Sequence, residues 1–262
     1  MLEQLIQARL GLEAPRFREI EDGWDSLVLE VDGQWLIRVP RRPEVREWMR
    51  REARLLPELG PALPVPVPRF EVVEDTDDVF FVAYRKLPGK PLGDPPVAVA
   101  AELGRFLAAL HSFRPSVELP RHRDPIERFR REVLTLLEQD ERRRAEAMFE
   151  ERLSTSETAL LHADLGPEHI LHEGSSVTGV IDWSDASLGD PALDFAWLLN
   201  GTSRAFAVAL LDAYSRESDA GFRERALFYH RLGPWHEVLY GLQNDRPELV
   251  ERGLAGIRDR LP

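Results

Sequence analysis

Several residue types and patterns are absent from this chain of 262 residues. It has no cysteine, which excludes disulfides, thiolate catalysis and cysteine-ligated zinc, and which fits a reducing compartment. No apolar run approaches the roughly 18 residues needed to cross a bilayer, because Glu102 and Arg105 interrupt the stretch VAVAAELGRFLAAL. The first residues, MLEQLIQARLGLEAP, lack the apolar core of a signal peptide. We therefore expect a cytoplasmic protein with no membrane contact.

An excess of positive charge is also lacking. The chain has 34 Lys and Arg against 46 Asp and Glu, and its net charge is −12. Proteins that bind DNA or RNA need clustered basic residues, so we expect no nucleic-acid partner. The acidic excess is concentrated in residues 91–199. A solvated acidic surface and the attraction of a cationic substrate are both compatible with this charge.

The first third of the chain has the pattern of a small antiparallel sheet. SLVLEV and WLIRVP are short, apolar and β-branched, and the turn DGQ separates them. Apolar residues recur at helical spacing over 43–59, with Pro43 near the start and Gly60 after the end. FEVVED and VFFVAY then resemble two further strands. Residues 1–86 are thus predicted to form an N-terminal lobe of one sheet and one helix.

After the Pro- and Gly-rich segment YRKLPGKPLGDPP the pattern becomes mostly helical. Apolar residues form a helical stripe over 103–110, and helical patterns return from Pro191 to the end of the chain. We predict an α+β fold with a hinge near 84–90 and a larger helical lobe over 91–262.

The stretch LLHADLGPEHIL contains the first candidate catalytic residue. Gly166 and Pro167 force a loop after a short apolar strand, and this loop would hold Asp164 in an exposed position. The turn HEGSS and the strand VTGVI then return the chain to the same neighbourhood at Asp182. Phosphoryl transfer needs two such carboxylates, one to orient and deprotonate the attacking hydroxyl and one to hold the metal ion that bridges the nucleotide phosphates.

Ordinary turn aspartates are the alternative interpretation of either carboxylate alone. Together, however, they belong to the pattern H-x-D-x-x-x-x-H, I-D-W and G-D-P-x-x-D, which also contains His162, His169, Asp190 and Asp194. The combination argues against a chance origin and favours a catalytic centre.

This pattern resembles the signature of the aminoglycoside phosphotransferase family, which are small-molecule kinases. It is most similar to the branch of aminoglycoside 2''-phosphotransferases and macrolide 2'-phosphotransferases, in which H-x-D-L-x-x-x-H-(I/L)-L is usual. The resemblance covers most of the chain. It implies a protein-kinase-like bilobal fold, with a small N-lobe of antiparallel sheet plus one helix and a larger, mostly helical C-lobe.

The resemblance implies that Asp164 is the catalytic base and that Asp182 and His169 hold Mg²⁺, or Mn²⁺ in its place. His169 stands where a protein kinase has asparagine. A neutral imidazole nitrogen can ligate a divalent ion, although Mg²⁺ prefers oxygen and Mn²⁺ accepts nitrogen more readily. Because this branch keeps a histidine here in active enzymes, the resemblance implies a substituted ligand and not a lost activity.

Support and acceptor contacts are assigned by the same resemblance. His162, Asp190 and Asp194 are expected to be structural, the two aspartates by capping a helix and by bracing the catalytic loop through its backbone amides. Trp183 and Asp185 follow the metal aspartate and are candidate acceptor contacts. Side-chain packing for the first and a simple turn for the second are the alternatives.

Nucleotide contacts are implied in the N-terminal lobe. Gly23 and Ser26 fall on the strand–turn–strand that covers the phosphates in this fold, with a plain β-turn as the alternative. Arg38 takes the place of the phosphate-binding lysine, and Glu52 that of its ion-pair partner. A guanidinium is permanently charged and can contact two phosphate oxygens at once. A weak surface Arg–Glu pair is disfavoured because Arg38 lies within an apolar strand.

The segment FFVAYRKLPGKPL resembles the hinge between the lobes. Backbone groups around Tyr84–Leu87, which include Arg85 and Lys86, are expected to hydrogen-bond the purine. Tyr84 matches a bulky gate position that narrows the adenine pocket, so we hypothesise that GTP is used at least as well as ATP. Simple core packing is the alternative for this tyrosine.

We therefore predict a small-molecule O-phosphotransferase that moves the γ-phosphate of GTP or ATP to a hydroxyl of an antibiotic-like acceptor. RVPRRP is typical of macrolide enzymes, whereas GWDS and YRKLPG are typical of 2''-aminoglycoside enzymes. The alternatives are a kinase of an endogenous sugar-like metabolite and a catalytically inactive nucleotide-binding regulator. We expect a monomer, although the sequence does not determine the oligomeric state.

Overall fold

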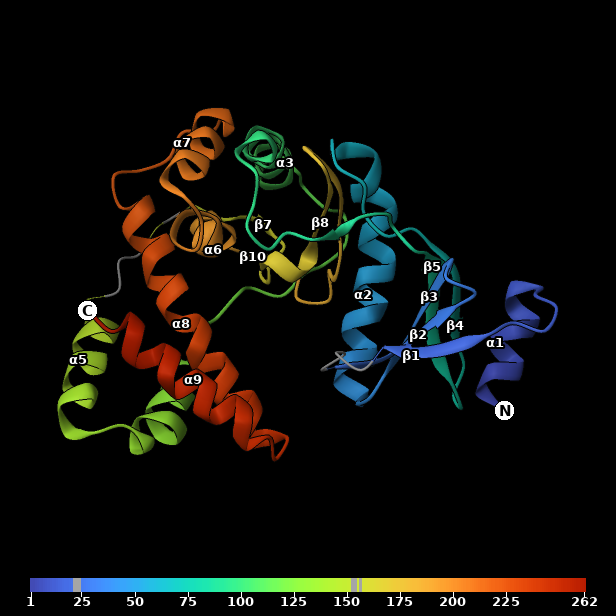
Figure 1. Cartoon of the computed structure of the whole chain (residues 1–262), viewed down its shortest axis with the longest axis horizontal. Helices are drawn as coiled ribbons and strands as arrows, with labels where there is room; N and C mark the ends of the chain where they lie inside the picture. The colour runs from blue at the N-terminus through green and yellow to red at the C-terminus, as the bar shows by residue number, and fades with distance from the viewer. Residues whose placement is uncertain (21–24, 152–154, 156) are drawn as a thin grey trace.

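The computed structural model describes residues 1–20, 25–151, 155 and 157–262. Its N-terminal part is a five-stranded antiparallel sheet in the order β1-β2-β3-β5-β4 (Figure 1). The strands are β1 (Phe17–Ile20), β2 (Ser26–Val31), β3 (Trp35–Pro40), β4 (Phe70–Asp75) and β5 (Phe80–Arg85). Asp32 and Gly33 both have positive φ (51° and 69°), which matches the predicted DGQ turn between β2 and β3.

Helices cover the two faces of this sheet. α1 (Leu2–Leu10) places Ile6 against Leu29 and Ile37 on one face, and α2 (Pro43–Leu59) places Met49 against Phe80 and Val82 on the other. Successive side chains of a strand point to opposite faces, and all side chains of β5 from Phe80 to Tyr84 are buried, so both faces of this strand are covered along that stretch. The sequence predicted α2 but not α1, which has a single fully buried residue and a weak apolar pattern.

The chain leaves the sheet at Arg85 and passes through a tight turn to β6 (Lys90–Pro91). Gly89 has φ 103°, and a Cβ there would lie 2.4 Å from Thr178 Oγ1 and 2.9 Å from the His172 carbonyl oxygen. Only glycine fits this position without a shift of its neighbours. The turn is therefore pressed against the hairpin that carries the candidate catalytic residues.

The remainder of the chain is mainly helical. Its helices are α3 (Ala100–Ser112), α4 (Ile126–Arg128), α5 (Gln139–Glu150), α6 (Ala196–Asn200), α7 (Arg204–Ala213), α8 (Phe222–Gln243) and α9 (Pro247–Arg260). Figure 1 shows α8 and α9 side by side, with α3, α6 and α7 grouped beyond the small strands. Their apolar side chains form the largest core of the molecule. None of the described helices is long and apolar enough to cross a membrane.

In the described part of the chain, five short strands lie between the sheet and these helices. β8 (Ile170–Glu173) and β9 (Ser176–Val180) form an antiparallel hairpin, with β6 paired to the outer edge of β8. β7 (Ala159–Leu161) pairs with β10 (Ser187–Gly189). β7 leads into the catalytic loop and β9 leads into the segment of the second aspartate, so the two pairings hold both loops together.

Candidate active site

The loop that follows β7 has an unusual backbone. Ala163 has φ 70°, a left-handed conformation that residues other than glycine seldom adopt. The carboxylate of Asp194 holds this conformation by accepting hydrogen bonds from the backbone N–H of His162 (3.0 Å) and of Ala163 (2.9 Å). Asp194 is 1% exposed. This geometry is the one that a bracing role for Asp194 requires.

A buried histidine supports that carboxylate in turn. In α3, His111 is fully buried and places Nε2 3.1 Å from Asp194 Oδ2 and Nδ1 2.8 Å from the Tyr214 hydroxyl. Burial by itself would raise the pKa of Asp194, but the hydrogen bond and the charge of His111 outweigh it and the pKa is lowered. Sequence reasoning missed His111 because it follows the apolar stripe of α3. The available signal was a polar residue at the end of a buried helix face.

Asp190 has a similar structural position at the start of the turn η6 (Pro191–Phe195). Its carboxylate accepts a hydrogen bond from the Ala192 N–H (3.1 Å) as the N-cap, and it pairs with the buried guanidinium of Arg225 in α8 at 2.7 Å. The aspartate therefore caps a short 3₁₀ turn, as the capping role expects, and also ties it to α8.

His162 connects the catalytic loop to the end of β9. Its Nε2–H donates to the Ile181 carbonyl at 2.9 Å, and its Nδ1 accepts from the Asp164 N–H at 3.3 Å. Burial, followed by the nearby charge of His169, lowers the pKa of His162 to about 4. The ring is neutral at physiological pH, which is what a donor on one side and an acceptor on the other require.

In the structure, the imidazole ring of His169 lies between the carboxylates of Asp164 and Asp182. His169 Nδ1 lies 3.5 Å from Asp164 Oδ2, and its Nε2 lies 3.8 Å from Asp182 Oδ2. The two carboxylate side chains are 55% and 41% exposed, whereas the imidazole between them is 15% exposed. Two acids that are 18 positions apart in the chain (164 to 182) thus face the same solvent-accessible space.

The hydrogen bonds of His169 indicate whether its ring and Asp182 are suited to bind a metal ion. His169 Nδ1 lies 2.7 Å from the Asp164 carbonyl oxygen, so Nδ1–H is the donor and the lone pair of Nε2 faces Asp182. A metal-ligating histidine usually donates its other ring N–H in this way. Across the described part of the chain, no three His, Asp or Glu side chains form a metal site by themselves. Two protein ligands suit Mg²⁺, which takes its other ligands from nucleotide phosphates and water.

The two carboxylates also change the pKa of the His169 imidazole. Burial lowers the pKa of His169, but the negative charges of Asp164 and Asp182 outweigh it, and the pKa is raised above its ordinary value. Metal binding would displace a proton from this ring. The residues present therefore fit Mg²⁺ or Mn²⁺ bound together with a nucleotide.

Arg38 joins the sheet, α2 and the β9 loop through one guanidinium. Its Nη1 lies 2.9 Å from Glu52 Oε1, and its Nη2 lies 2.7 Å from Asp182 Oδ1. Arg38 and Glu52 are 6% and 1% exposed, so the pair is buried. The predicted Arg38–Glu52 ion pair is present, and the surface-pair alternative is excluded by this burial.

The expected nucleotide contact of the Ser26 side chain is wrong in this structure. Ser26 is 4% exposed, and its hydroxyl lies 3.8 Å from Met49 Sδ on the inner side of α2. In a strand the direction of a side chain depends on its register, which places Ser26 toward the core. Gly23, expected to act with it, lies outside the described residues.

At the hinge, Tyr84 is buried and its ring packs against Phe70 with centroids 5.6 Å apart. The side chains of its neighbours Arg85 and Lys86 are engaged by other residues of the sheet. The Arg85 guanidinium stacks on the Trp35 ring at 3.8 Å, and the Lys86 ammonium pairs with Glu30. The backbone N–H of Lys86 donates to Gln34 (2.8 Å), so this group cannot bind a purine as expected.

The expected acceptor contact of Trp183 is also wrong. The indole is 1% exposed, donates its N–H to the Val180 carbonyl at 2.9 Å, and contacts the rings of Phe106 and His162 edge-on. A buried side chain of this size is part of the core, so the packing alternative describes it. The neighbouring Asp185 differs, because it is exposed.

Asp185 has a strongly perturbed carboxyl group. Desolvation by the surrounding protein atoms raises its pKa to about 7, and the charges of Asp164 and Asp182 add to this effect. The folded protein therefore holds a proton on Asp185 more tightly than the unfolded chain, whose aspartates titrate near about 3.9. The contribution of Asp185 to the free energy of unfolding is fully present below about pH 4 and is lost as the pH rises toward 7.

Replacing Asp185 with asparagine is expected to remove this penalty. The variant should melt roughly 2–4 °C above the wild type at pH 8 and equally with it at pH 4. Thermal unfolding of the metal-free protein between pH 4 and 8 measures the difference. Asp212→Asn, an exposed position of α7, removes the same charge elsewhere and is the control. A difference that does not change with pH would contradict the assignment.

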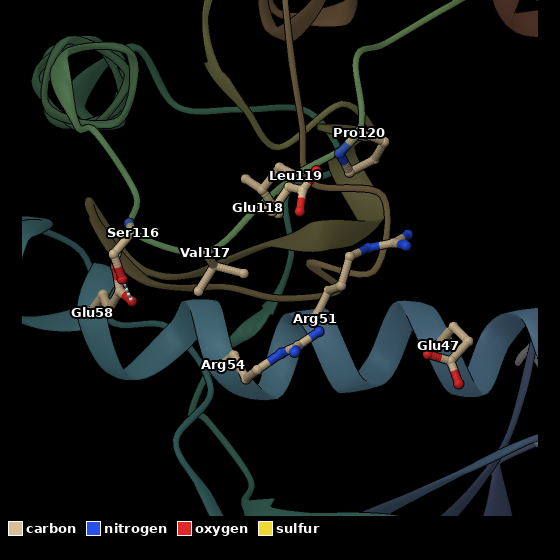
Figure 2. A pocket seen from close by; sticks show the side chains of 9 residues that line it. All are labelled: Glu47, Arg51, Arg54, Glu58, Ser116, Val117, Glu118, Leu119 and Pro120. Atoms are coloured by element: carbon tan, nitrogen blue, oxygen red, sulfur yellow. Dashed lines mark hydrogen bonds between the residues drawn. The ribbon is translucent and has the colours of Figure 1, made fainter.

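One hollow of the described surface lies outside this group of residues. About 830 Å³ of space lies between α2 and residues 116–120 (Figure 2). It is lined on the helix side by Glu47, Arg51, Arg54 and Glu58, which recur at helical spacing on a face that does not include Glu52. With Glu118 the lining has three carboxylates and two guanidiniums, so its charge favours neither an anion nor a cation.

Fold and site together define a class of protein. An antiparallel sheet with a buried Arg–Glu pair, a helical lobe, and two carboxylates brought together by a hairpin are the parts of a protein-kinase-like phosphotransferase. Residues 16–228 match the family model of the phosphotransferase enzyme family (APH). The chain belongs to this family.

Relatives and solved structures agree with this assignment. The viomycin phosphotransferase of Streptomyces vinaceus is 26% identical over 207 residues, which cover 71% of this chain and 72% of that protein. Macrolide 2'-phosphotransferase MphH from Brachybacterium faecium is 27% identical in structural alignment, with a TM-score of 0.76 and coverage of 98% and 97%. The complex of APH(2'')-IIIa with GDP and kanamycin has a TM-score of 0.84 at 21% identity, covering 99% and 97%. The predicted protein-kinase-like bilobal fold is confirmed.

Proposed function

We propose that this protein transfers the γ-phosphoryl group of GTP or ATP to a hydroxyl of an antibiotic-like acceptor. The observation that carries the proposal is the convergence of Asp164, His169 and Asp182 around one ring, beside the buried guanidinium of Arg38. Positioning and charge neutralisation account for most of the rate in this type of reaction, and these four side chains supply both.

Each of these residues has a separate part in the proposed reaction. The side chain of Asp164 is the most exposed of the four. Desolvation by nearby protein atoms raises the pKa of its carboxyl group. A raised pKa suits a group that accepts the proton of the acceptor hydroxyl. Asp182 and His169 would hold Mg²⁺ or Mn²⁺, which supplies charge neutralisation at the phosphates. Arg38, held by Glu52, would contact the phosphates directly.

The charge of the cleft favours an acceptor with basic groups. Burial raises the pKa of Asp185, and the charges of Asp164, Asp182 and Asp25 raise it further, which supports an excess of negative charge around this position. Glu168 adds a further negative charge that acts on Asp164. The structural relatives include a kanamycin complex and macrolide enzymes, and the sequence relative is named for viomycin. A polyamine or amino-sugar antibiotic would complement these carboxylates.

For the nucleotide, we propose purine contacts through the backbone of Arg85 and Leu87, with Tyr84 narrowing the pocket. The expected result is that kcat/KM with GTP equals or exceeds that with ATP. Tyr84→Leu is expected to raise kcat/KM for ATP several-fold, because it removes the bulk of the gate. Steady-state kinetics with both nucleotides measures this, and Phe70→Leu loosens the same ring contact as a control. A strong preference for ATP in the wild type would refute the gate.

The function itself is tested by a phosphate-transfer screen of aminoglycosides, macrolides, viomycin-like peptides and sugar metabolites with both nucleotides. Transfer to a sugar metabolite alone would favour the metabolite-kinase alternative. A protein that neither transfers phosphate nor hydrolyses nucleotide above background would be the inactive regulator. We also propose a cytoplasmic location, which the absence of cysteine fits, and a monomer, whose oligomeric state sedimentation measures.

A further inference from the structure

Ser184 stands at the centre of the charged group that Arg38 forms. Its hydroxyl oxygen lies 2.7 Å from Arg38 Nη2, the nitrogen that also contacts Asp182 Oδ1 at 2.7 Å. The same oxygen lies 3.2 Å from Asp182 Oδ1 and 3.3 Å from Glu52 Oε2. Ser184 is 7% exposed, and Arg38 and Glu52 are also buried, so water has little access to the Ser184 hydroxyl. One neutral hydroxyl thus touches all three charged groups.

A hydroxyl has one proton to donate and lone pairs to accept with. Arg38 can only donate, so the Ser184 oxygen accepts from it, and the Ser184 proton is left for either Asp182 or Glu52. Both carboxylates are within reach and the proton can serve one at a time. In one arrangement the serine donates its hydrogen bond to Asp182, and in the other it donates to Glu52.

This choice matters when a nucleotide binds. A metal ion bound with the nucleotide would take Asp182 as a ligand, and Arg38 would then lose part of the attraction that holds Nη2. If the Ser184 hydroxyl rotates so that it donates its hydrogen bond to Glu52, the Ser184 oxygen still accepts from Arg38 Nη2 and keeps the guanidinium in place. Glu52 accepts a further hydrogen bond from the Trp183 N–H at 3.3 Å, so this carboxylate stays fixed throughout.

We propose that Ser184 is a positioning residue, which holds the Arg38 guanidinium for the nucleotide phosphates while Asp182 is released to the metal. The proposal rests on the function proposed above and adds a residue to it. Sequence reasoning did not single out Ser184, which is a small hydroxyl residue two positions after the metal aspartate.

The matched control for this proposal lies three residues further along the chain. Ser187 is also buried, at 4% exposed, and its hydroxyl has no hydrogen-bond partner among the described residues. Ser187→Ala removes the same atom from the same segment without breaking a contact to a charged group. Ser184→Thr keeps the hydroxyl and is the conservative variant.

Calorimetric titration of the full chain with Mg²⁺ and a non-hydrolysable GTP analogue is the first measurement. Ser184→Ala is expected to weaken binding about tenfold, because a hydrogen bond to a charged group is lost. Ser187→Ala should match the wild type and Ser184→Thr should recover most of the affinity. With an active acceptor, Ser184→Ala should raise KM for the nucleotide and leave KM for the acceptor unchanged.

Equal affinities for Ser184→Ala and Ser187→Ala would overturn the proposal. So would a fall in melting temperature with both Michaelis constants raised together, since this indicates general loss of structure. If the wild type binds the analogue but transfers no phosphate to any acceptor, the function proposed above fails, and the titration still decides the role of Ser184. If the wild type binds no nucleotide, both proposals fail.

Discussion

Replacing Asp164 with alanine is expected to lower the turnover number at least a hundredfold and to leave nucleotide affinity nearly unchanged. General-base assistance contributes roughly 10²–10⁴-fold. The contacts that shape the catalytic loop use the backbone of Asp164, whose N–H donates to His162 and whose carbonyl accepts from His169. Its carboxylate is 55% exposed. Its removal should therefore leave the fold and the Arg38 network intact.

Single-turnover and steady-state rates measure this effect, and binding of a GTP analogue measures the affinity. Glu173→Gln is the control, because it removes an exposed carboxylate at the end of β8. A variant of Asp164 with near-normal turnover would show that this aspartate is not the base. A loss of analogue binding would show that it contributes to the nucleotide site.

The Arg38–Glu52 pair is expected to give the second large effect. Arg38→Met should destabilise the fold by about 3–5 kcal/mol, because it leaves the carboxylate of Glu52 buried without its positively charged partner. It should also abolish measurable phosphate transfer, since it removes the phosphate contact. Replacing both members with apolar residues, as in Arg38→Met with Glu52→Leu, should restore most of the stability.

The double variant separates structure from function. It should unfold in urea near the wild-type midpoint and still transfer no phosphate. Arg143→Leu, which breaks an exposed ion pair with Asp140 in α5, should change stability little and is the control for loss of an arginine. A double variant that regains activity would show that the guanidinium is only structural. A single variant of normal stability would show that the pair is not buried in solution.

How far the sequence could predict the fold depended on how much local pattern each element carried. β5 was recognisable because a strand buried on both faces is a continuous apolar run, and α2 because its apolar residues repeat at helical spacing between a proline and a glycine. α1 was missed because only Ile6 is fully buried, so that its pattern was too weak to recognise.

The side-chain directions near the site were less predictable. Ser26 and Trp183 were expected at the ligands but lie in the core, since strand register and packing decided which way each points. His111 and Ser184 were not expected, because their partners come from other parts of the chain. His111 meets Asp194 and Ser184 meets Glu52, and nothing near either residue in the sequence indicates these contacts.

By itself, the sequence determined the chemistry that this protein has available: the two acids and the histidine of the catalytic segment, the arginine within an apolar strand, and the family to which they belong. Residue type and local spacing are sufficient for that, because they depend only on neighbouring positions. Only the tertiary structure decided that Arg38, Glu52, Asp182 and Ser184 share one hydrogen-bonded network, because contacts between the lobes depend on how the hairpin, α2 and the sheet pack.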